Sequence, residues 1–310
     1  MIIFIVQYVY IFEEIRIMSK ARRRLGDRRD GRLLRGLDGM HLIMPMLYPN
    51  RCDNEAFVSE RIDLTKADEY LAKRNAEKPV FKFTLFHLIV VALLKVIMLR
   101  PKLNYFIANK NMYERNEISA SFVIKKQFAD ESSEGLAFIR AEREDDLDSI
   151  RTKLYEQVTH VKKGGTDSSS DAMDMLTKFP RFLVKFFVWL MRIFDRLGIV
   201  PKSLIATDPY YASAILSNVG SIKLKSGYHH LTNWGTTSVF CMVGEMKKRA
   251  FYDGDKVELR NSVELGLTID ERIADGYYYS KSVRLLKYIL ENPECLERPL
   301  SEPVDFEKAV

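Results

Sequence analysis

The sequence contains few of the residues that build disulfides and metal centres: its 310 residues include three cysteines and five histidines. Cys52, Cys241 and Cys295 are far apart and odd in number, which excludes a disulfide framework and favours a reducing compartment. No cysteine or histidine pair has metal-ligand spacing, and we expect the adjacent His229 and His230 to point in different directions. We therefore predict no metal and a cytoplasmic protein.

The chain also lacks a hydrophobic run long enough to cross a membrane. Its first twelve residues are apolar apart from Gln7, but they are too short to span a bilayer and have neither a basic leader nor a cleavage site. Met18 stands directly before a basic segment. We expect translation to begin there, with residues 1–17 as an upstream extension; the alternative is a start at Met1 and a short membrane-surface tag.

Net positive charge is scarce outside one segment. The formal net charge is +6, and residues 18–37 supply all of it, with eight Lys or Arg against two Asp. The rest of the chain is close to neutral, which argues against a basic face that binds nucleic acid. We expect residues 1–49 to form an N-terminal extension and a solvated basic arm that packs lightly on the domain. Contact of this arm with RNA, anionic lipid or an acidic neighbour is the alternative.

Hydrophobic residues, in contrast, make up 47% of the chain, enough for a substantial core. Apolar residues at helical spacing predict helices within residues 62–75 (with Asp63 or Thr65 as N-cap), over 84–99, 143–163 and 181–198, and after Gly276. Alternating patterns predict strands over residues 117–125, 212–216, 236–245 and 263–270, with a hairpin turn at 252–256. The chain is therefore expected to be a mixed α/β protein.

Two of these helices have unusual composition. Residues 84–99 are apolar nearly all round, which is typical of a central buried helix, and His87 within it is expected to be a hydrogen-bonded core residue. Residues 181–198 carry four basic side chains on one narrow stripe of an otherwise apolar helix. We expect this helix, in an insert over residues 164–205 that begins with a flexible break at 164–171, to pack within the protein, on its own domain or a neighbouring subunit. Peripheral membrane contact through residues 181–198 is the alternative.

Polar turns follow two of the predicted strands. The first contains Ser217, Asn218 and Gly220 in the letters SNVG. The second runs from Asp270 to Gly276 as DERIADG, where Gly276 permits a tight turn. Each alone is ordinary turn chemistry, but together they indicate a site.

These two turns, with the stretch LRPKLNYFI at residues 99–107, resemble a family of acyltransferases. The family includes chloramphenicol acetyltransferase and the catalytic domain of the dihydrolipoyl acyltransferases of 2-oxo acid dehydrogenase complexes. Its closing motif is a histidine, three residues, then Asp or Asn and Gly, and its serine turn is S-N-x-G. The resemblance runs from about residue 50 to 292, so we expect a catalytic domain over 50–298 and a tail over 299–310.

The resemblance implies a two-layer α+β sandwich, in which a mixed sheet has helices on one face, assembled as a homotrimer. Family active sites lie between subunits, where coenzyme A enters one mouth of a channel and the acyl acceptor the other. Ser217 would stabilise the oxyanion of a tetrahedral intermediate, with Asn218 in its turn. Asp275 would be structural and paired with Arg51, and Gly276 would close the motif.

The departure from the family is Glu271, which stands where the catalytic histidine is expected. An imidazole has a reference pKa of about 6.5, whereas that of a Glu carboxyl is about 4.3. Burial in an apolar channel can raise a carboxyl pKa to about 6 or 7. Glu271 is therefore interpreted as a general base or acid; the alternative is an anionic partner of Arg272 or a lysine that holds the turn. His229 or His230 as a replacement base has no precedent in the family.

Two functions follow from this sequence. The first is a stand-alone acyltransferase, since no lipoyl-type domain is evident, with coenzyme A as co-substrate and an unknown thiol, hydroxyl or amine acceptor. The second is a catalytically inactive trimeric homologue that acts as a binding or scaffold protein. A location at a membrane surface is one form of this alternative.

Overall fold

The computed structural model describes residues 23–125, 134–162 and 175–306. The expectations about residues 1–17, a start at Met18 and a break at 164–171 therefore lie outside the described residues. No helix within the described ranges is both long and apolar enough to cross a membrane.

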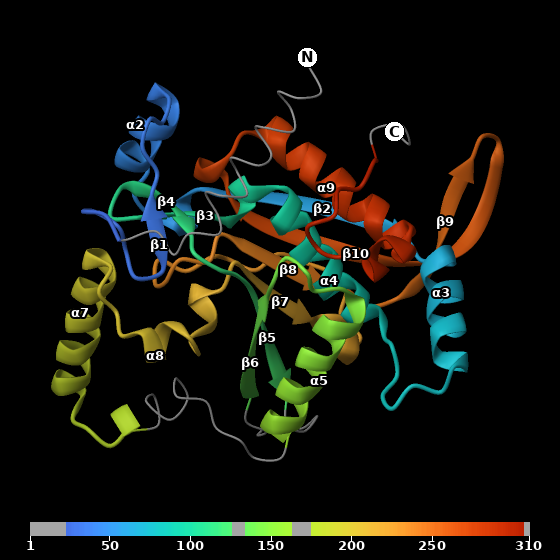
Figure 1. Cartoon of the computed structure of the whole chain (residues 1–310), viewed down its shortest axis with the longest axis horizontal. Helices are drawn as coiled ribbons and strands as arrows, with labels where there is room; N and C mark the ends of the chain where they lie inside the picture. The colour runs from blue at the N-terminus through green and yellow to red at the C-terminus, as the bar shows by residue number, and fades with distance from the viewer. Residues whose placement is uncertain (1–22, 126–133, 163–174, 307–310) are drawn as a thin grey trace.

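A seven-stranded mixed sheet forms the centre of the molecule (Figure 1). Along the sheet the order is β2 (Glu55–Asp63), β10 (Lys256–Asp270), β8 (Val239–Val243), β7 (Ala214–Asn218), β5 (Ile118–Lys125) and β6 (Glu134–Ala141), while β9 (Lys247–Asp253) pairs with the first part of β10. Strand β7 runs parallel to both neighbours, and the other pairs are antiparallel. The sequence patterns located β5, β7, β8 and the end of β10 but missed β2 and β6.

Strand β10 shows how side-chain alternation builds this sheet. Leu265, Leu267 and Ile269 are buried against the helices, as their spacing predicts. The strand is longer than the predicted segment because the β9–β10 hairpin extends it well beyond the body of the molecule (Figure 1). Gly254 takes a φ of +60° at the predicted turn of this hairpin, a conformation that glycine adopts without strain.

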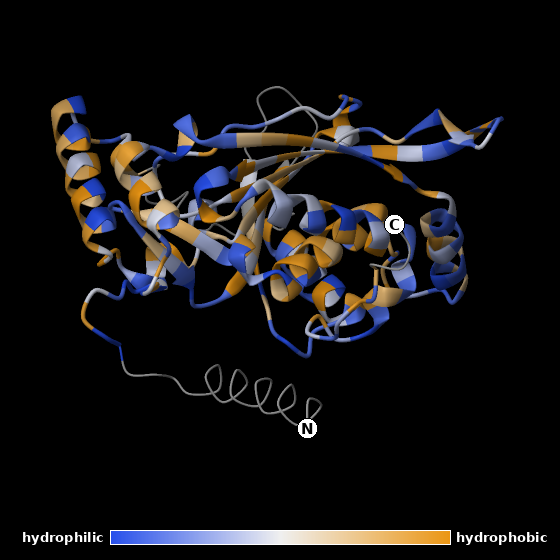
Figure 2. Ribbon diagram, turned by 90° about the horizontal axis from the view of Figure 1, so that it is seen from above, coloured by the Kyte–Doolittle hydropathy of each residue, from blue (hydrophilic) through white to orange (hydrophobic). Residues whose placement is uncertain are grey.

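Helices cover one face of the sheet (Figure 2). They are α3 (Thr65–Ala76), α4 (Leu85–Leu99), α5 (Leu147–Lys162) and α9 (Gly276–Glu291). Helix α4 is buried along Leu88–Ile97, which confirms the predicted central helix. The expected N-cap of α3 is wrong: Leu64 occupies that position, and the Asp63 carboxylate accepts the backbone N–H of Thr65 instead. The arrangement is the expected two-layer sandwich.

His87 is a structural residue at the start of α4. Its backbone N–H donates to the Thr84 hydroxyl, and its Nδ1 accepts the Thr84 backbone N–H at 3.2 Å. Burial, and secondarily the charge of Arg151, lowers the pKa of His87 to about 4. The imidazole is therefore neutral at physiological pH, as a ring nitrogen that accepts a hydrogen bond requires.

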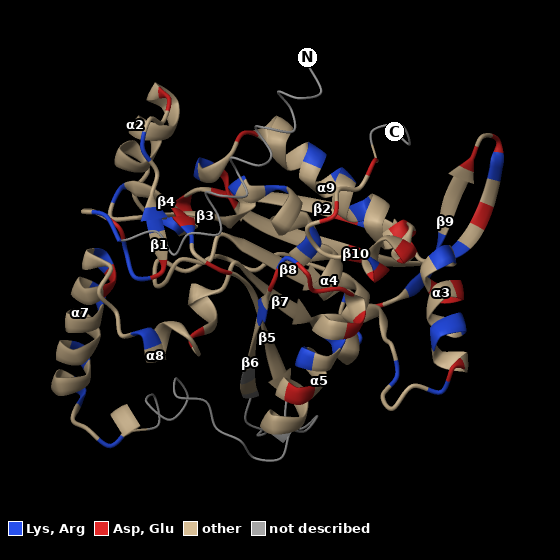
Figure 3. Ribbon diagram, viewed as in Figure 1, with Lys and Arg blue, Asp and Glu red and all other residues tan. Residues whose placement is uncertain are grey.

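A second, three-stranded sheet forms from β1 (Gly31–Leu33), β4 (Asn111–Arg115) and β3 (Tyr105–Ala108). Strand β1 belongs to the segment that we expected to be a solvated arm, and Arg28 just before it is buried. The Arg28 guanidinium binds Asp30 at 2.9 Å and Asp195 at 3.0 Å. The solvated-arm expectation is wrong for this segment, because the acidic partners neutralise its charge; blue and red segments adjoin around β1 and β4 in Figure 3.

Helix α7 (Arg181–Leu197) stands at the edge of the molecule, beyond α2 (Gly39–Leu47) and α8 (Lys202–Ile205). None of its residues is buried, and Phe182, Phe186 and Trp189 are 70%, 52% and 57% exposed. The expectation that α7 packs on its own domain holds only in part, because Leu183, Leu190 and Phe194 are half-buried. Asp195 anchors the helix by binding Arg28, and the rest of the apolar face turns outward.

Candidate active site

The turn that carries Glu271 is built from buried neighbours. Strand β10 ends at Asp270, a single 3-10 turn follows over Glu271–Ile273, and α9 begins at Gly276. Asp270 is fully buried, and Arg272 is 2% exposed. The Arg272 guanidinium donates to both oxygens of Asp270, from Nε at 2.8 Å and from Nη2 at 2.6 Å. This bidentate pair holds the turn from inside.

Arg51 reaches the same carboxylate. Its Nε lies 3.7 Å from Asp270 Oδ2, and its Nη atoms donate to the backbone carbonyls of Thr232, Ile107 and Gly235. Burial lowers the pKa of Arg51, although the charge of Asp270 opposes this shift.

The expected pairing of Arg51 with Asp275 is wrong. Asp275 is exposed and caps α9, where its carboxylate accepts the backbone N–H of Tyr278 at 2.8 Å. That hydrogen bond, more than any charge, lowers the pKa of Asp275. Asp270 takes the pairing because its side chain points inward from the strand. Gly276 has no positive φ, and a Cβ there would meet nothing within 4 Å, so the single chain does not need glycine for this turn.

Glu271 projects outward between its buried neighbours Asp270 and Arg272. Its backbone N–H donates to the Asn54 carbonyl at 2.9 Å, and its side chain is exposed. The carboxylate makes no hydrogen bond or ion pair with another residue in the described ranges. The alternative of a Glu271–Arg272 pair is wrong, because Asp270 occupies that guanidinium.

Ser217 lies at the end of β7, half-buried, opposite Met242 of β8. Asn218 caps the following turn, where its Oδ1 accepts the backbone N–H of Ser221 at 3.3 Å. Gly220 permits two segments of the chain to pass close to each other, since a Cβ there would lie 2.4 Å from the Gly244 carbonyl oxygen. The Ser217 hydroxyl makes no hydrogen bond with another described residue, so it is free to donate to a ligand.

Strand register places Ser217 and Glu271 at opposite ends of the sheet. Ser217 is level with Met242, and Met242 is level with Gly266 of β10. Glu271 lies five residues further along β10, about 17 Å away at the rise of an extended strand. A single chain therefore does not bring the two side chains together.

A strap, residues 223–235, crosses the face of the sheet away from the helices, between these two ends. It lies so close to β10 that a Cβ on Gly266 would meet the Gly227 carbonyl oxygen at 1.9 Å. On the strap, the His229 ring stacks on Phe240 and on His230, with the two imidazole centroids 4.6 Å apart. Our expectation that these rings point in different directions is wrong; they stack because Phe240 offers a flat apolar surface. No group suited to a metal occurs among the described residues.

Sequence reasoning missed the Asp270–Arg272 pair, which positions the whole turn. The signal was available: opposite charges two residues apart lie at the end of a strand whose alternate residues are apolar. It also missed Asn54, whose carbonyl holds the Glu271 backbone, because β2 was not predicted.

The fold and the two turns define an acyltransferase-like domain. Residues 203–297, which include both turns, match the family model of the 2-oxoacid dehydrogenases acyltransferase (catalytic domain). The expected resemblance to this family and the expected fold class are thereby confirmed. A search of curated protein sequences finds no match.

Solved structures with the same fold include dihydrolipoamide acetyltransferases. A probable dihydrolipoamide acetyltransferase from Listeria monocytogenes 4b F2365 is 16% identical, with a TM-score of 0.57 over 87% of this chain and 96% of that one. The Azotobacter vinelandii enzyme is 14% identical, with a TM-score of 0.57 over 82% and 90%. A truncated catalytic core of the 2-oxoacid dehydrogenase multienzyme complex from Thermoplasma acidophilum is 14% identical, with a TM-score of 0.53 over 84% and 99%. At such identities these likenesses show the fold.

Proposed function

We propose that this protein is a coenzyme A-dependent acyltransferase whose active site forms between two protomers, with Glu271 from one and Ser217 from the other. The observation that carries the proposal is the outward projection of Glu271 between two polar residues, Asp270 and Arg272, that are buried and paired. A carboxylate held in this way is available to a substrate. The acceptor is a thiol, hydroxyl or amine.

Motif spacing supports the roles of these residues. Work on the catalytic mechanism of the Azotobacter vinelandii enzyme concerns a serine, a histidine 52 residues later and an asparagine four residues after the histidine. Here Ser217 precedes Glu271 by 54 residues, and Asp275 follows Glu271 by four. Glu271 therefore takes the position of the histidine in this proposal.

The chemistry divides between the two side chains. Glu271 takes the proton of the acceptor, and the acceptor attacks the thioester carbonyl carbon of the acyl-coenzyme A. Ser217 of the adjacent protomer donates a hydrogen bond to the oxyanion that forms. When the tetrahedral intermediate collapses, the carbon–sulfur bond breaks and Glu271 returns the proton to the coenzyme A sulfur. A carboxyl needs a dry surrounding for this work, so the adjacent protomer must cover Glu271.

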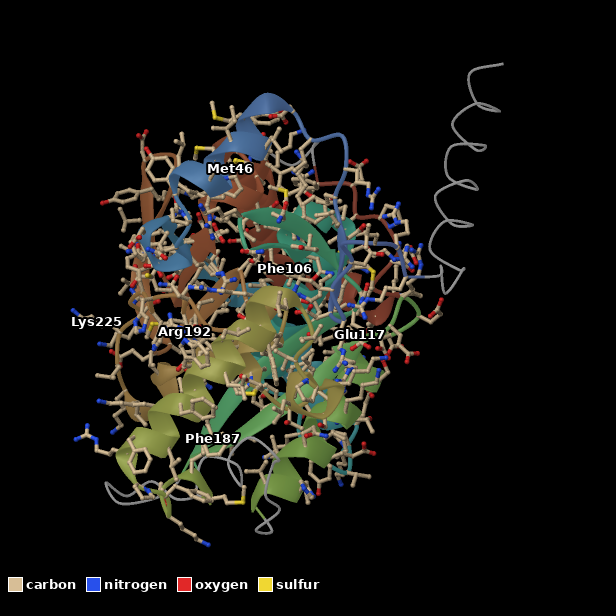
Figure 4. All side chains as sticks on the ribbon, turned by 90° about the vertical axis from the view of Figure 1, so that its left-hand side faces the viewer. Met46, Phe106, Glu117, Phe187, Arg192 and Lys225 are labelled. Atoms are coloured by element: carbon tan, nitrogen blue, oxygen red, sulfur yellow. The ribbon has the colours of Figure 1, made fainter. Side chains whose placement is uncertain are left out.

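A homotrimer is the assembly that we propose. One structure with this fold is the cubic core of the pyruvate dehydrogenase multienzyme complex. In this chain α2 and α7 lie on the same side of the molecule and expose apolar side chains there, with Met46 on α2 and Phe187 on α7 (Figure 4). Exposed apolar surface of this extent is typical of an interface.

The test measures thiol release from acetyl-coenzyme A in the presence of amine, hydroxyl and thiol acceptors. Glu271→Gln and Ser217→Ala should each lower turnover at least about 100-fold, because each removes a group that acts in the transition state. Glu69→Gln, which changes an exposed glutamate on α3, should leave turnover unchanged. Size-exclusion chromatography should show the same assembly for all variants.

The second candidate is a non-catalytic scaffold of the same fold. It is favoured by one observation: no described residue orients the Glu271 carboxylate. Wild-type protein that binds coenzyme A with every acceptor present and never releases thiol would replace the enzymatic proposal with this one. Membrane contact through the exposed face of α7 belongs to this alternative.

A further inference from the structure

A basic hollow of about 320 Å³ opens beside the Asp270–Arg272 pair. Arg51 and Arg272 line its floor, and the C-terminal half of α7 forms a wall, with Arg192, Asp195 and Arg196. The turn between β3 and β4 forms the opposite wall and contributes Lys110. Figure 4 shows Arg192 on this side of the molecule, above Phe187 on the same helix. The volume is at the lower end of the range for small-molecule sites, about 300–1,000 Å³.

Positive charge around the hollow is compensated only in part, because Asp270 pairs with Arg272 and Arg51 but not with the other cations. Five cations and a single carboxylate, that of Asp195, line it. That carboxylate is already occupied, because it accepts hydrogen bonds from Arg28 at 3.0 Å and from the Tyr211 hydroxyl at 2.9 Å. Lys110, Arg192 and Arg196 form no hydrogen bond or ion pair with a described residue. Three cations are thus free to receive an anion.

The floor adds a buried excess of positive charge. Arg51 is 4% exposed, and its Nε has no hydrogen-bond acceptor. Behind it lies Arg115, 6% exposed, whose Nε also has no acceptor and whose pKa burial lowers to about 9. The other donors of both guanidinium groups are taken by backbone carbonyls and by Thr236, but each group keeps one buried N–H without an acceptor. A buried positive charge is costly to desolvate, so an anion in the hollow would reduce that cost.

Lys110 is held in a conformation that lysine disfavours. Asn109 and Lys110 have φ values of +45° and +62°, as the two central residues of a type I′ hairpin turn require. Glycine is the usual second residue of such a turn, because a side chain there is strained. The chain keeps a lysine in this place, at the rim of the hollow.

We propose that this hollow binds a phosphoryl group, carried by a soluble phosphate ester or by a lipid headgroup. Arg192, Arg196 and Lys110 contact the phosphoryl oxygens, and Arg51 and Arg272 supply the positive field from below. A phosphate has up to two negative charges and several acceptor oxygens, which match planar guanidinium groups better than a single carboxylate does. Coenzyme A, the co-substrate proposed above, is itself a phosphate ester, but the experiments below use pyrophosphate and vesicles, so their outcome does not depend on acyl transfer.

The first experiment titrates inorganic pyrophosphate into the full-length protein by calorimetry at constant ionic strength. Arg192→Ala/Arg196→Ala should weaken binding at least about tenfold, because each charged hydrogen bond contributes substantially. The matched control is Arg181→Ala/Lys185→Ala, which removes the same charge from the same helix but not from the hollow. This control should bind like wild type. No binding by wild type, or equal loss in both pairs, would overturn the proposal.

A second experiment separates the two sources of phosphate. Wild-type protein is sedimented with phosphatidylcholine vesicles, with and without phosphatidic acid. A lipid headgroup is assigned by vesicle binding that meets three conditions. This binding requires phosphatidic acid, is lost in Arg192→Ala/Arg196→Ala and is displaced by pyrophosphate. Pyrophosphate binding without vesicle binding assigns a soluble ester. Vesicle binding that pyrophosphate leaves unchanged excludes a lipid headgroup as the occupant of the hollow.

A third experiment uses the strained turn. Lys110→Gly should raise the melting temperature, because glycine relieves the positive φ, and should weaken pyrophosphate binding at the same time. Lys78→Gly relieves a φ of +52° at the end of α3, far from the hollow, and should leave binding unchanged. Because Lys110→Gly is expected to stabilise the fold, loss of binding could not be attributed to unfolding. Unchanged binding by Lys110→Gly would remove Lys110 from the site.

Discussion

Arg272 holds Asp270 through two hydrogen bonds of 2.8 and 2.6 Å, although the two residues are separated by only Glu271. The intervening residue is forced outward, because its neighbours on both sides point into the core. Arg51 approaches the same carboxylate at 3.7 Å and ties the turn to β3 and the strap. The position of Glu271 is therefore a consequence of buried electrostatics behind it.

Removing Arg272 should strongly destabilise the protein. Arg272→Ala leaves a fully buried carboxylate without its main partner, a loss of about 3–5 kcal/mol in the free energy of unfolding. Urea denaturation followed by circular dichroism measures it. The control is Arg260→Ala, whose pairs with Asp63 and Glu258 lie at the surface and should contribute little. Equal effects of the two variants would show that the buried pair has no special role.

Mixing two inactive variants should restore activity. The register separates Ser217 from Glu271 within a chain, so Glu271→Gln and Ser217→Ala each damage one half of a shared site. Random reassembly of equal amounts in a cyclic trimer gives about one quarter of sites with both native residues. Thiol release after denaturation and joint refolding measures the recovery. No recovery, with trimers present, would argue against a site shared between protomers.

Stability should fall between about pH 6.5 and pH 4 because of His87. Its pKa is lowered to about 4 in the folded chain from an ordinary 6.5, so in this window only the unfolded chain takes up the proton. The stabilisation is complete above pH 6.5, and about 2–3 kcal/mol is lost as pH falls through the window. His87→Gln keeps a capping acceptor but does not titrate, and should flatten this part of the profile. If the stability of His87→Gln fell with pH in parallel with that of wild type, His87 would be excluded as the cause of the fall.

Substitution by alanine should affect stability differently at two glycines. A Cβ on Gly266 would meet the Gly227 carbonyl oxygen at 1.9 Å, so Gly266→Ala must displace the strap. We expect a loss of about 2 kcal/mol or more in the free energy of unfolding. Gly276→Ala lies in the first turn of α9 with open space around it and should be neutral or slightly stabilising. Thermal denaturation compares the two variants.

The sequence by itself determined the elements whose signals are local. Helix α4 is marked by continuous apolar residues, and the end of β10 by strict alternation. These patterns work because hydrogen bonds and side-chain periodicity within one element set its type. The two polar turns resemble those of a known acyltransferase family, and this resemblance predicted the two-layer fold.

Only the tertiary structure decided which charges pair and which apolar faces are covered. Arg51 binds Asp270 and not Asp275, because the strand end points one carboxylate inward and the helix start leaves the other outside. Helix α7 exposes part of its apolar surface, and Asp195 anchors the helix to Arg28. The distance between Ser217 and Glu271 depends on the register of three strands. Such relations join residues far apart in the chain, and no local pattern encodes them.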